Sequence, residues 1–84
     1  MASPGALTVL GIDPALTVTG YGIIVAEGDR YRSVHFGFVA PPVKAPLPER
    51  LYRIHEALTG VIREFRPDEV AVEDFITGFV RAAV

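Results

Sequence analysis

The 84-residue sequence contains no cysteine, which excludes a disulfide framework and a thiolate metal site. It also lacks the charged region and long apolar stretch of a signal peptide, and no apolar run approaches the roughly 18 residues needed to span a bilayer. The formal charge of −2 shows none of the basic excess that nucleic-acid-binding domains usually carry. These absences predict a soluble, cytoplasmic protein with no membrane segment.

The composition that remains is globular, with 50% hydrophobic and 21% charged residues. A chain this short can bury one modest core and no more. We therefore predict a single domain, or part of one, over residues 1–84.

Four apolar runs bounded by breakers predict strands, over about residues 7–13, 21–26, 30–39 and 69–73. The second and third runs are separated only by Glu27-Gly28-Asp29, a short turn that indicates a hairpin. The first three strands are therefore expected to form an antiparallel meander in a mixed α/β sheet.

One helix is predicted between the third and fourth strands. Apolar residues recur at helical spacing over residues 48–65, after a proline-rich connector, and Pro67 follows the last of them. Gly60 inside this helix costs about 1 kcal/mol relative to alanine, which suggests close packing against the sheet. Residues 74–84 are apolar again and could begin a second helix.

Two of the predicted strands end on an acid, Asp13 and Glu73. The helix acts as a crossover, so the fourth strand can lie parallel to the first and beside it, about 4.8 Å away. Both acids then project from one edge of the sheet, where open α/β sheets place their sites. Two close carboxylates repel unless a cation lies between them, and oxygen ligands favour Mg²⁺ or Mn²⁺. Two such ions about 3.5–4 Å apart are the arrangement used to cleave phosphodiesters.

Each candidate residue also has a simpler explanation. An Asp-Pro pair after a strand is more often a turn than a ligand, by about two to one, and Glu73 alone would be a solvated strand end. Thr17 and Thr19 could contact phosphate, but loop hydroxyls more often bond to local backbone. Phe75 could stack on a base or face a core. Only the predicted proximity of the two acids favours a metal site.

Five short motifs occur in order along the chain: Gly11–Pro14, Thr19–Gly22, Leu47–Leu51, Phe65–Asp68 and Val70–Glu73. Together they resemble the RuvC-type Holliday-junction resolvases. The resemblance runs from about Leu7 to Phe75, nearly the whole chain. It implies a ribonuclease H-like fold and a homodimer that cuts four-way DNA junctions in recombination and repair, with a branch-migration helicase complex as a partner.

The resemblance also implies the chemistry and the site residues. It implies hydrolysis that depends on Mg²⁺ or Mn²⁺, with two ions in the complete site. The family roles carry over to Asp13 and Glu73 as metal-binding catalytic acids. An aromatic that wedges into the junction falls nearest to Phe75, with Ile76 and Phe79 as competitors.

The sequence departs from the family pattern in three respects, of which one is the segment that follows Glu73. Ala15 stands where the family usually has glycine, and a positive φ there would cost about 1–2 kcal/mol. Members of the family are also longer, and their remaining catalytic acids lie on a C-terminal helix. We therefore expect residues 1–84 to be an incomplete nuclease domain, truncated before the last strand and the C-terminal helices and nearly inactive alone.

Two other interpretations stay open from the residues. One is a non-catalytic ribonuclease H-like module whose acids are vestigial and whose surface binds DNA or a protein partner. The other is the shorter YqgF-type nuclease family, which shares the fold and the order of the acids. The proline-ended helix that leads to Glu73 favours the resolvase type. Metal identity, junction sequence preference and oligomeric state are not fixed by the sequence.

Overall fold

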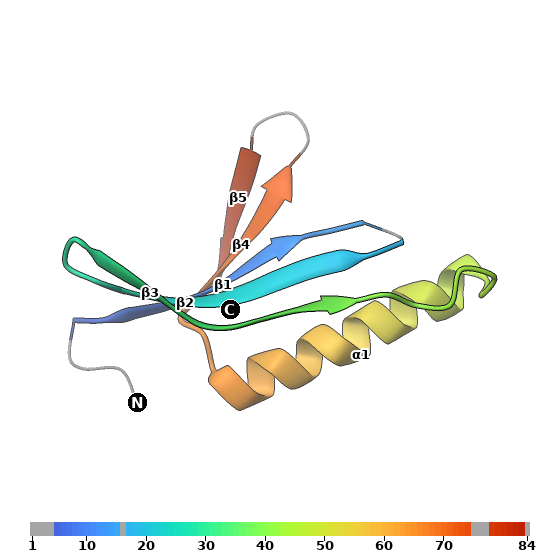
Figure 1. The fold of residues 1–84 in the computed structure, drawn as a ribbon, viewed down its shortest axis with the longest axis horizontal. Coiled ribbons are helices and arrows are strands. Elements are labelled where there is room, and N and C mark those ends of the chain that lie inside the picture. The colour runs from blue at the N-terminus through green and yellow to red at the C-terminus, as the bar shows by residue number, and fades with distance from the viewer. Residues whose placement is uncertain (1–4, 16, 75–77, 84) are drawn as a thin grey trace.

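The computed structural model of this protein describes residues 5–15, 17–74 and 78–83. These residues form the following elements: β1 (Leu7–Asp13), β2 (Thr19–Glu27), β3 (Arg30–Val39), α1 (Leu47–Phe65), β4 (Glu69–Asp74) and β5 (Gly78–Ala83). Figure 1 shows the strands as one twisted sheet with α1 alongside it. In the part of the chain that is described, no helix has the length and apolar character needed to cross a membrane.

The strands form one sheet in the order β3-β2-β1-β4-β5. β1 and β2 pair antiparallel, as do β2 and β3, whereas β1 and β4 are parallel. The predicted meander, crossover helix and parallel fourth strand are therefore confirmed. A parallel neighbour requires a long connection, and α1 supplies it.

A fifth strand was not predicted before the end of the chain. β5 pairs antiparallel with β4, from Asp74 opposite Gly78 to Glu69 opposite Ala83. The expectation of a helix beginning in residues 74–84 is therefore wrong for the residues described, and the sheet extends one strand further than expected. Without β5 the outer edge of β4 would present unpaired backbone N–H and C=O groups, and the pairing satisfies them.

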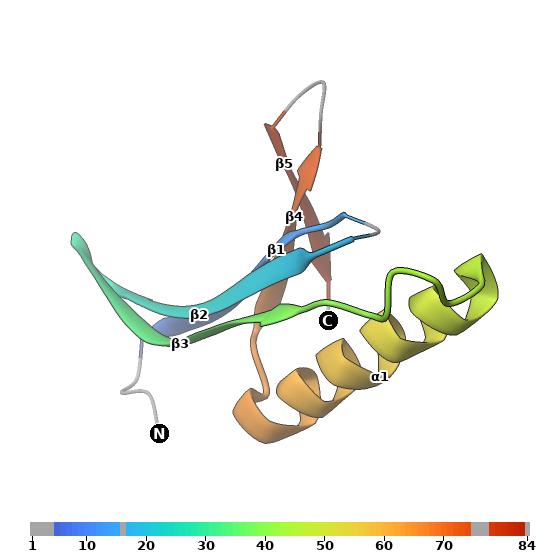
Figure 2. The same cartoon turned by 45° about the vertical axis from the view of Figure 1, so that its right-hand side comes forward.

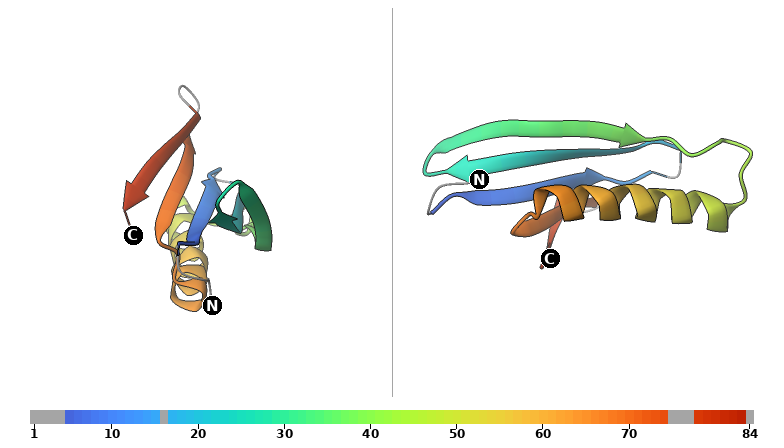
Figure 3. Two further views of the ribbon diagram at one scale, coloured as in Figure 1. Left: turned by 90° about the vertical axis from the view of Figure 1, so that its left-hand side faces the viewer. Right: turned by 90° about the horizontal axis from the view of Figure 1, so that it is seen from below.

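The core lies between the sheet and α1, on one face of the sheet. Leu10 and Ile23 are opposite each other on β1 and β2, and both have 0% exposure. His35 is the next residue in this row, opposite Ile23. Its ring stacks on Phe65 of α1 at 5.0 Å between centroids, and its Nε2 lies 3.2 Å from the Tyr21 hydroxyl oxygen. This row joins the helix to the sheet, and Figure 3 shows the helix covering that face alone.

A bulge in β3 explains why the apolar residues of this strand do not keep a strict alternation along the sequence. Ile23 pairs with His35 but Ile24 pairs with Ser33, so Val34 is the extra residue. A bulge places two residues opposite one and shifts the alternation of side chains by one position. The apolar residues before and after the shift therefore share the face opposite α1, and they are exposed there: Tyr31, Val34, Phe36 and Phe38.

The helix begins and ends where the prolines predict. Pro46 precedes its first residue, and after Phe65 the chain turns at Arg66, with a φ of 47° and a hydrogen bond from its N–H to the carbonyl oxygen of Ile62. Only the C-terminal half of α1 lies against the sheet. The N-terminal half extends past it, as Figure 2 shows, and Leu47 and Leu51 are each 50% exposed.

Gly60 does not pack closely against the sheet, so that expectation is wrong. A Cβ added at this position would have nothing within 4 Å.

Gly60→Ala should therefore raise the free energy of unfolding by about 0.5–1 kcal/mol, because alanine restricts the unfolded chain more than glycine does. Urea unfolding measures the change. The matched control is Gly28→Ala, at φ +60° in the β2–β3 turn, which should destabilise by about 1 kcal/mol. Destabilisation by Gly60→Ala would show a contact that the structure does not contain.

Candidate metal centre at the ends of β1 and β4

Asp13 is the last residue of β1 and is exposed. Side chains alternate along a strand, so Asp13 lies on the face opposite buried Leu10 and therefore opposite α1. Pro14 follows it and has no N–H to continue the pairing, which ends the strand at the acid.

Glu73 comes to the same place from β4. The parallel register sets Gly11 opposite Ala71 and Ile12 opposite Val72, so Asp13 and Glu73 are the next residues on the two strands. The two carboxyl groups are close enough for Asp13 to raise the pKa of Glu73. The structure thus brings together the two acids that lie 60 residues apart in sequence.

The neighbouring acid raises the pKa of Glu73 above its usual value. The largest cause is the hydrogen bond to Asp13, followed by the negative charge of Asp13 and then a slight loss of hydration. A shared proton relieves the repulsion between two carboxyl groups, and a cation between them would do the same. The pair is therefore electrostatically suited to bind a positive ion.

The donor set fits a hard divalent cation. Both side chains offer only oxygen, the ligand that Mg²⁺ and Mn²⁺ prefer. Among the residues that the structure describes, no group of three or more His, Cys, Asp or Glu side chains could hold a metal ion. Asp13 and Glu73 would therefore fill only part of a coordination shell, and water or other groups would fill the rest.

The sheet beside the acids carries almost no side chains. Gly11 of β1 lies opposite Gly22 of β2 and Ala71 of β4, and Asp13 lies opposite Gly20. A Cβ added to Gly11 would meet only the Gly22 carbonyl oxygen, at 4.0 Å. The backbone is thus open to a ligand beside the carboxylates.

Asp68 is a positioning residue that the sequence analysis missed. Its carboxylate Oδ2 accepts a hydrogen bond from the Thr8 N–H at 2.8 Å, and its own N–H donates to the Thr8 carbonyl oxygen at 2.8 Å. This pair of hydrogen bonds fixes the start of β4 against β1, and so sets the register that brings Glu73 beside Asp13. In the sequence Asp68 stands out only as the last residue of the motif Phe65–Asp68, and nothing there indicates its contact with Thr8.

The three weaker DNA-contact candidates have different outcomes. Thr19 is 1% exposed, and its hydroxyl donates to the Ala15 carbonyl oxygen at 2.7 Å and accepts from the Ala15 N–H at 3.2 Å. This bonding to local backbone closes the β1–β2 loop and agrees with the simpler explanation given for a loop hydroxyl, and contact of Thr19 with DNA stays a prediction. Thr17 is exposed and stays a prediction. Phe75 lies outside the described residues.

The departure at Ala15 carries no backbone strain. Among the described residues, Arg66 is the non-glycine residue with a positive φ, and Ala15 is not one. Alanine therefore fits the loop without the cost expected for a left-handed conformation.

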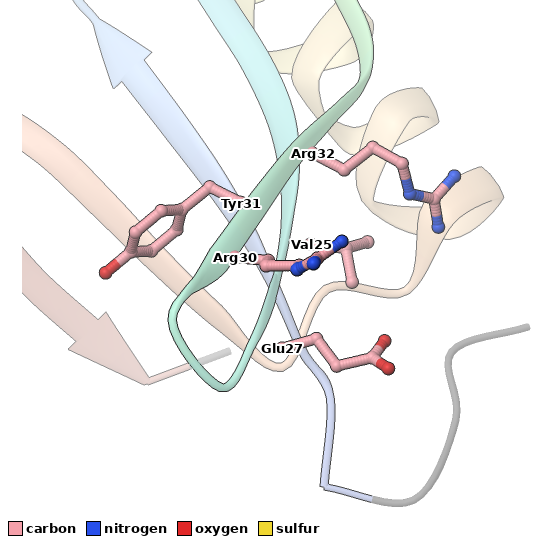
Figure 4. Close-up of a pocket in the computed structure, with 5 residues that line it drawn as sticks. All are labelled: Val25, Glu27, Arg30, Tyr31 and Arg32. Atoms are coloured by element: carbon pink, nitrogen blue, oxygen red, sulfur yellow. The ribbon is translucent and has the colours of Figure 1, made fainter.

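A separate pocket of about 410 Å³ lies at the turn of the β2–β3 hairpin. Figure 4 shows Arg32 and Glu27 to the right of the hairpin and Tyr31 to its left, with Arg30 in the centre of the view. Six residues of β2 separate this end from Gly20, a distance of about 20 Å. The pocket is therefore separate from the acid pair, and the carboxylate of Glu27 offsets one of the two arginine charges that line it.

The four-strand core, a meander followed by a crossover helix and a strand parallel to the first, is a ribonuclease H-like fold. The family model described as crossover junction endodeoxyribonuclease RuvC matches residues 9–83. The chain belongs to the RuvC family.

Individual relatives agree with this assignment. The chain is 46% identical over 67 residues to a crossover junction endodeoxyribonuclease RuvC of Dehalococcoides mccartyi, covering 80% of this chain and 41% of the relative. It is 40% identical to the Magnetococcus marinus enzyme of that name, covering 100% of this chain and 47% of the relative. The structure of T. thermophilus RuvC in complex with Holliday junction substrate aligns with a TM-score of 0.76 at 38% identity, covering 81% of this chain and 42% of that one. The chain thus spans less than half the length of these relatives.

Glu73→Gln should stabilise the protein at neutral pH in metal-free buffer. The pKa of Glu73 is higher in the folded state than in the unfolded state, so the protonated side chain favours the folded state. This stabilisation is fully present below the unfolded-state pKa and is lost as the pH rises through the folded-state pKa. Glutamine does not ionise, so it avoids that loss. Thermal unfolding over a pH series should show the variant above wild type at neutral pH and equal to it in acid. Glu64→Gln, at an exposed acid on α1, is the control. A Glu73→Gln variant that is less stable than wild type at neutral pH would contradict repulsion between the two carboxylates.

Proposed function

We propose that this chain supplies part of the active site of a metal-dependent, structure-selective endonuclease that resolves four-way DNA junctions in recombination and repair. The observation that carries the proposal is the carboxylate pair Asp13 and Glu73 at the ends of adjacent parallel strands in a RuvC family member. The solved relative bound to a Holliday junction substrate supports the choice of DNA substrate.

Asp13 and Glu73 would be the metal ligands and catalytic acids, holding Mg²⁺ or Mn²⁺, with two ions in the complete site. Such ions, when bound, lower the pKa of water and stabilise negative charge on a phosphate. Both carboxyl groups must be ionised to coordinate a cation. The raised pKa of Glu73 therefore makes cation affinity increase as the pH rises through it.

The pair is not a full site. Two carboxylates leave most coordination positions to other groups, and the chain spans only 41% and 47% of two relatives' lengths. We propose that these residues alone cut little DNA. A homodimer, a branch-migration helicase partner and a cytoplasmic location are proposed from family membership. A YqgF-type nuclease or a non-catalytic module is not favoured, since the matched relatives are RuvC enzymes.

Asp13→Asn should weaken Mn²⁺ binding by at least about tenfold, because it replaces one of two charged ligands. Isothermal titration calorimetry at neutral pH compares the variant with wild type. Glu64→Gln removes one negative charge away from the pair and should bind Mn²⁺ as wild type does. Equal affinity of Asp13→Asn and wild type would mean that the acids are vestigial.

A synthetic four-way junction incubated with the chain and Mg²⁺ or Mn²⁺ should remain almost uncut, because the coordination shell is incomplete. Denaturing electrophoresis of end-labelled strands measures incision, and Asp13→Asn sets the background. Robust cutting that Asp13→Asn abolishes would show that these residues hold a sufficient site. Cutting that persists in Asp13→Asn would place the chemistry elsewhere.

A further inference from the structure

β4, the strand that carries Glu73, is held in the sheet less firmly than β1. Its parallel ladder covers β1 only from Val9 to Ile12, whereas β2 pairs with β1 from Leu7 to Asp13. Parallel pairing is also slightly less stable per residue than antiparallel pairing. β5 pairs with β4 alone and therefore moves with it. The position of Glu73, one residue beyond the end of the ladder with β1, thus depends on where the chain enters β4.

The connection from α1 to β4 is short and stiff. Only residues 66–68 separate Phe65, the last residue of α1, from β4. Arg66 has a φ of 47° and its N–H is bonded to the last turn of the helix. Pro67 is buried and its ring fixes φ, and Asp68 is bonded to the start of β1. The position of the last helical turn over the sheet therefore determines where β4 begins.

The last turn of α1 rests on β3. Of the strands, β3 makes the main contact with α1, and the Phe65 ring stacks on the His35 ring with 5.0 Å between centroids and 19° between planes. His35 begins a row of paired residues that crosses the sheet from β3 to β4 through Ile23, Leu10 and Val70. The end of the helix is thus supported in the same row in which β4 pairs with β1.

His35 is itself held in place from β2. Its Nε2 lies 3.2 Å from the Tyr21 hydroxyl oxygen, and the two rings are 5.7 Å apart. Tyr21 is opposite Gly37, and a Cβ added to Gly37 would be 2.6 Å from the Tyr21 hydroxyl oxygen and 2.8 Å from its Cζ. The tyrosine therefore reaches His35 only because position 37 has no side chain. Tyr21, His35 and Gly37 are called the helix seat below.

We propose that His35 is a positioning residue for Glu73: at the centre of the helix seat, it fixes the last turn of α1 and, through residues 66–68, the point at which β4 joins β1. This inference rests on the proposed function, in which Glu73 is a metal ligand. His35 lies on the face that α1 covers, opposite the acid pair. It therefore acts on the site through the backbone of β4, and loss of the seat should loosen β4 while the β1–β2 pairing stays intact.

Two measurements test the positioning role: Mn²⁺ affinity by isothermal titration calorimetry, and amide hydrogen exchange along β1, β2 and β4. His35→Ala removes the stacked ring, and Gly37→Ala displaces Tyr21 without changing His35. Both should weaken Mn²⁺ binding by about 2- to 30-fold, the range for substitutions that do not touch the ligand. Both should also speed the exchange of amides bonded between β1 and β4 more than that of amides bonded between β1 and β2.

Two further variants separate the seat from general stability. The double variant Tyr21→Phe with His35→Phe keeps both rings and removes both polar groups, so it should bind Mn²⁺ and exchange nearly as wild type does. Gly28→Ala is the matched control, because it strains the β2–β3 turn away from the seat. Compared with His35→Ala at the same interval below its own melting temperature, it should change neither Mn²⁺ affinity nor the exchange of β4.

Several results would overturn the positioning role. Wild-type Mn²⁺ affinity in His35→Ala and Gly37→Ala, with binding still weakened by Asp13→Asn, would remove it and leave the proposed function standing. Equal weakening by Gly28→Ala would show that general stability governs the site. If His35→Ala does not fold, Gly37→Ala decides by the same criteria. A wild-type chain that binds no Mn²⁺ would remove the proposed function, and the positioning role with it.

Discussion

The hydrogen bonds between Thr8 and Asp68 join the starts of two strands that the sequence keeps far apart, and the parallel pairing of β1 with β4 continues from them. They fix β4 against β1 at the point where the chain leaves α1, and parallel pairing then proceeds residue by residue to the acids. A shift of one residue would turn Glu73 to the other face of the sheet. The candidate site therefore depends on a contact at the opposite end of the strands, in a turn with no catalytic chemistry of its own.

This register puts two negative groups where stability alone would not put them. Asp13 raises the pKa of Glu73 through hydrogen bonding and its charge, so ionising both groups is less favourable than ionising either alone. A protein selected only for stability would place a polar, uncharged residue at one of these positions. A perturbed carboxyl pair next to an open, glycine-lined backbone is a candidate functional site.

Much of this architecture was predictable because it depends on patterns that the sequence displays directly. Apolar runs and breakers located the meander and α1, and the length of the crossover predicted the parallel strand that joins Asp13 and Glu73. The features that were missed depend on contacts between distant residues. Asp68 ends one of the family motifs, but its hydrogen bonds to Thr8 depend on how β4 meets β1, and the burial of Thr19 follows from how its loop closes. The pairing of β5 with β4 likewise depends on an edge that exists only in the folded sheet.

The two faces of the sheet carry different kinds of side chain, and the bulge at Val34 determines which residues of β3 lie on each face. Without the bulge, strict alternation of side chains along β3 would place Phe36 and Phe38 on the face that α1 covers, beside buried Ile23. One extra residue sends them to the open face and leaves His35 to meet the helix. The core therefore forms on one side, from Leu10, Ile23 and the stacked rings of His35 and Phe65, while the carboxylates and the exposed phenyl rings lie on the other. Because β3 is also the edge strand, it can absorb this irregularity without disturbing the β1–β4 pairing on which the acids depend.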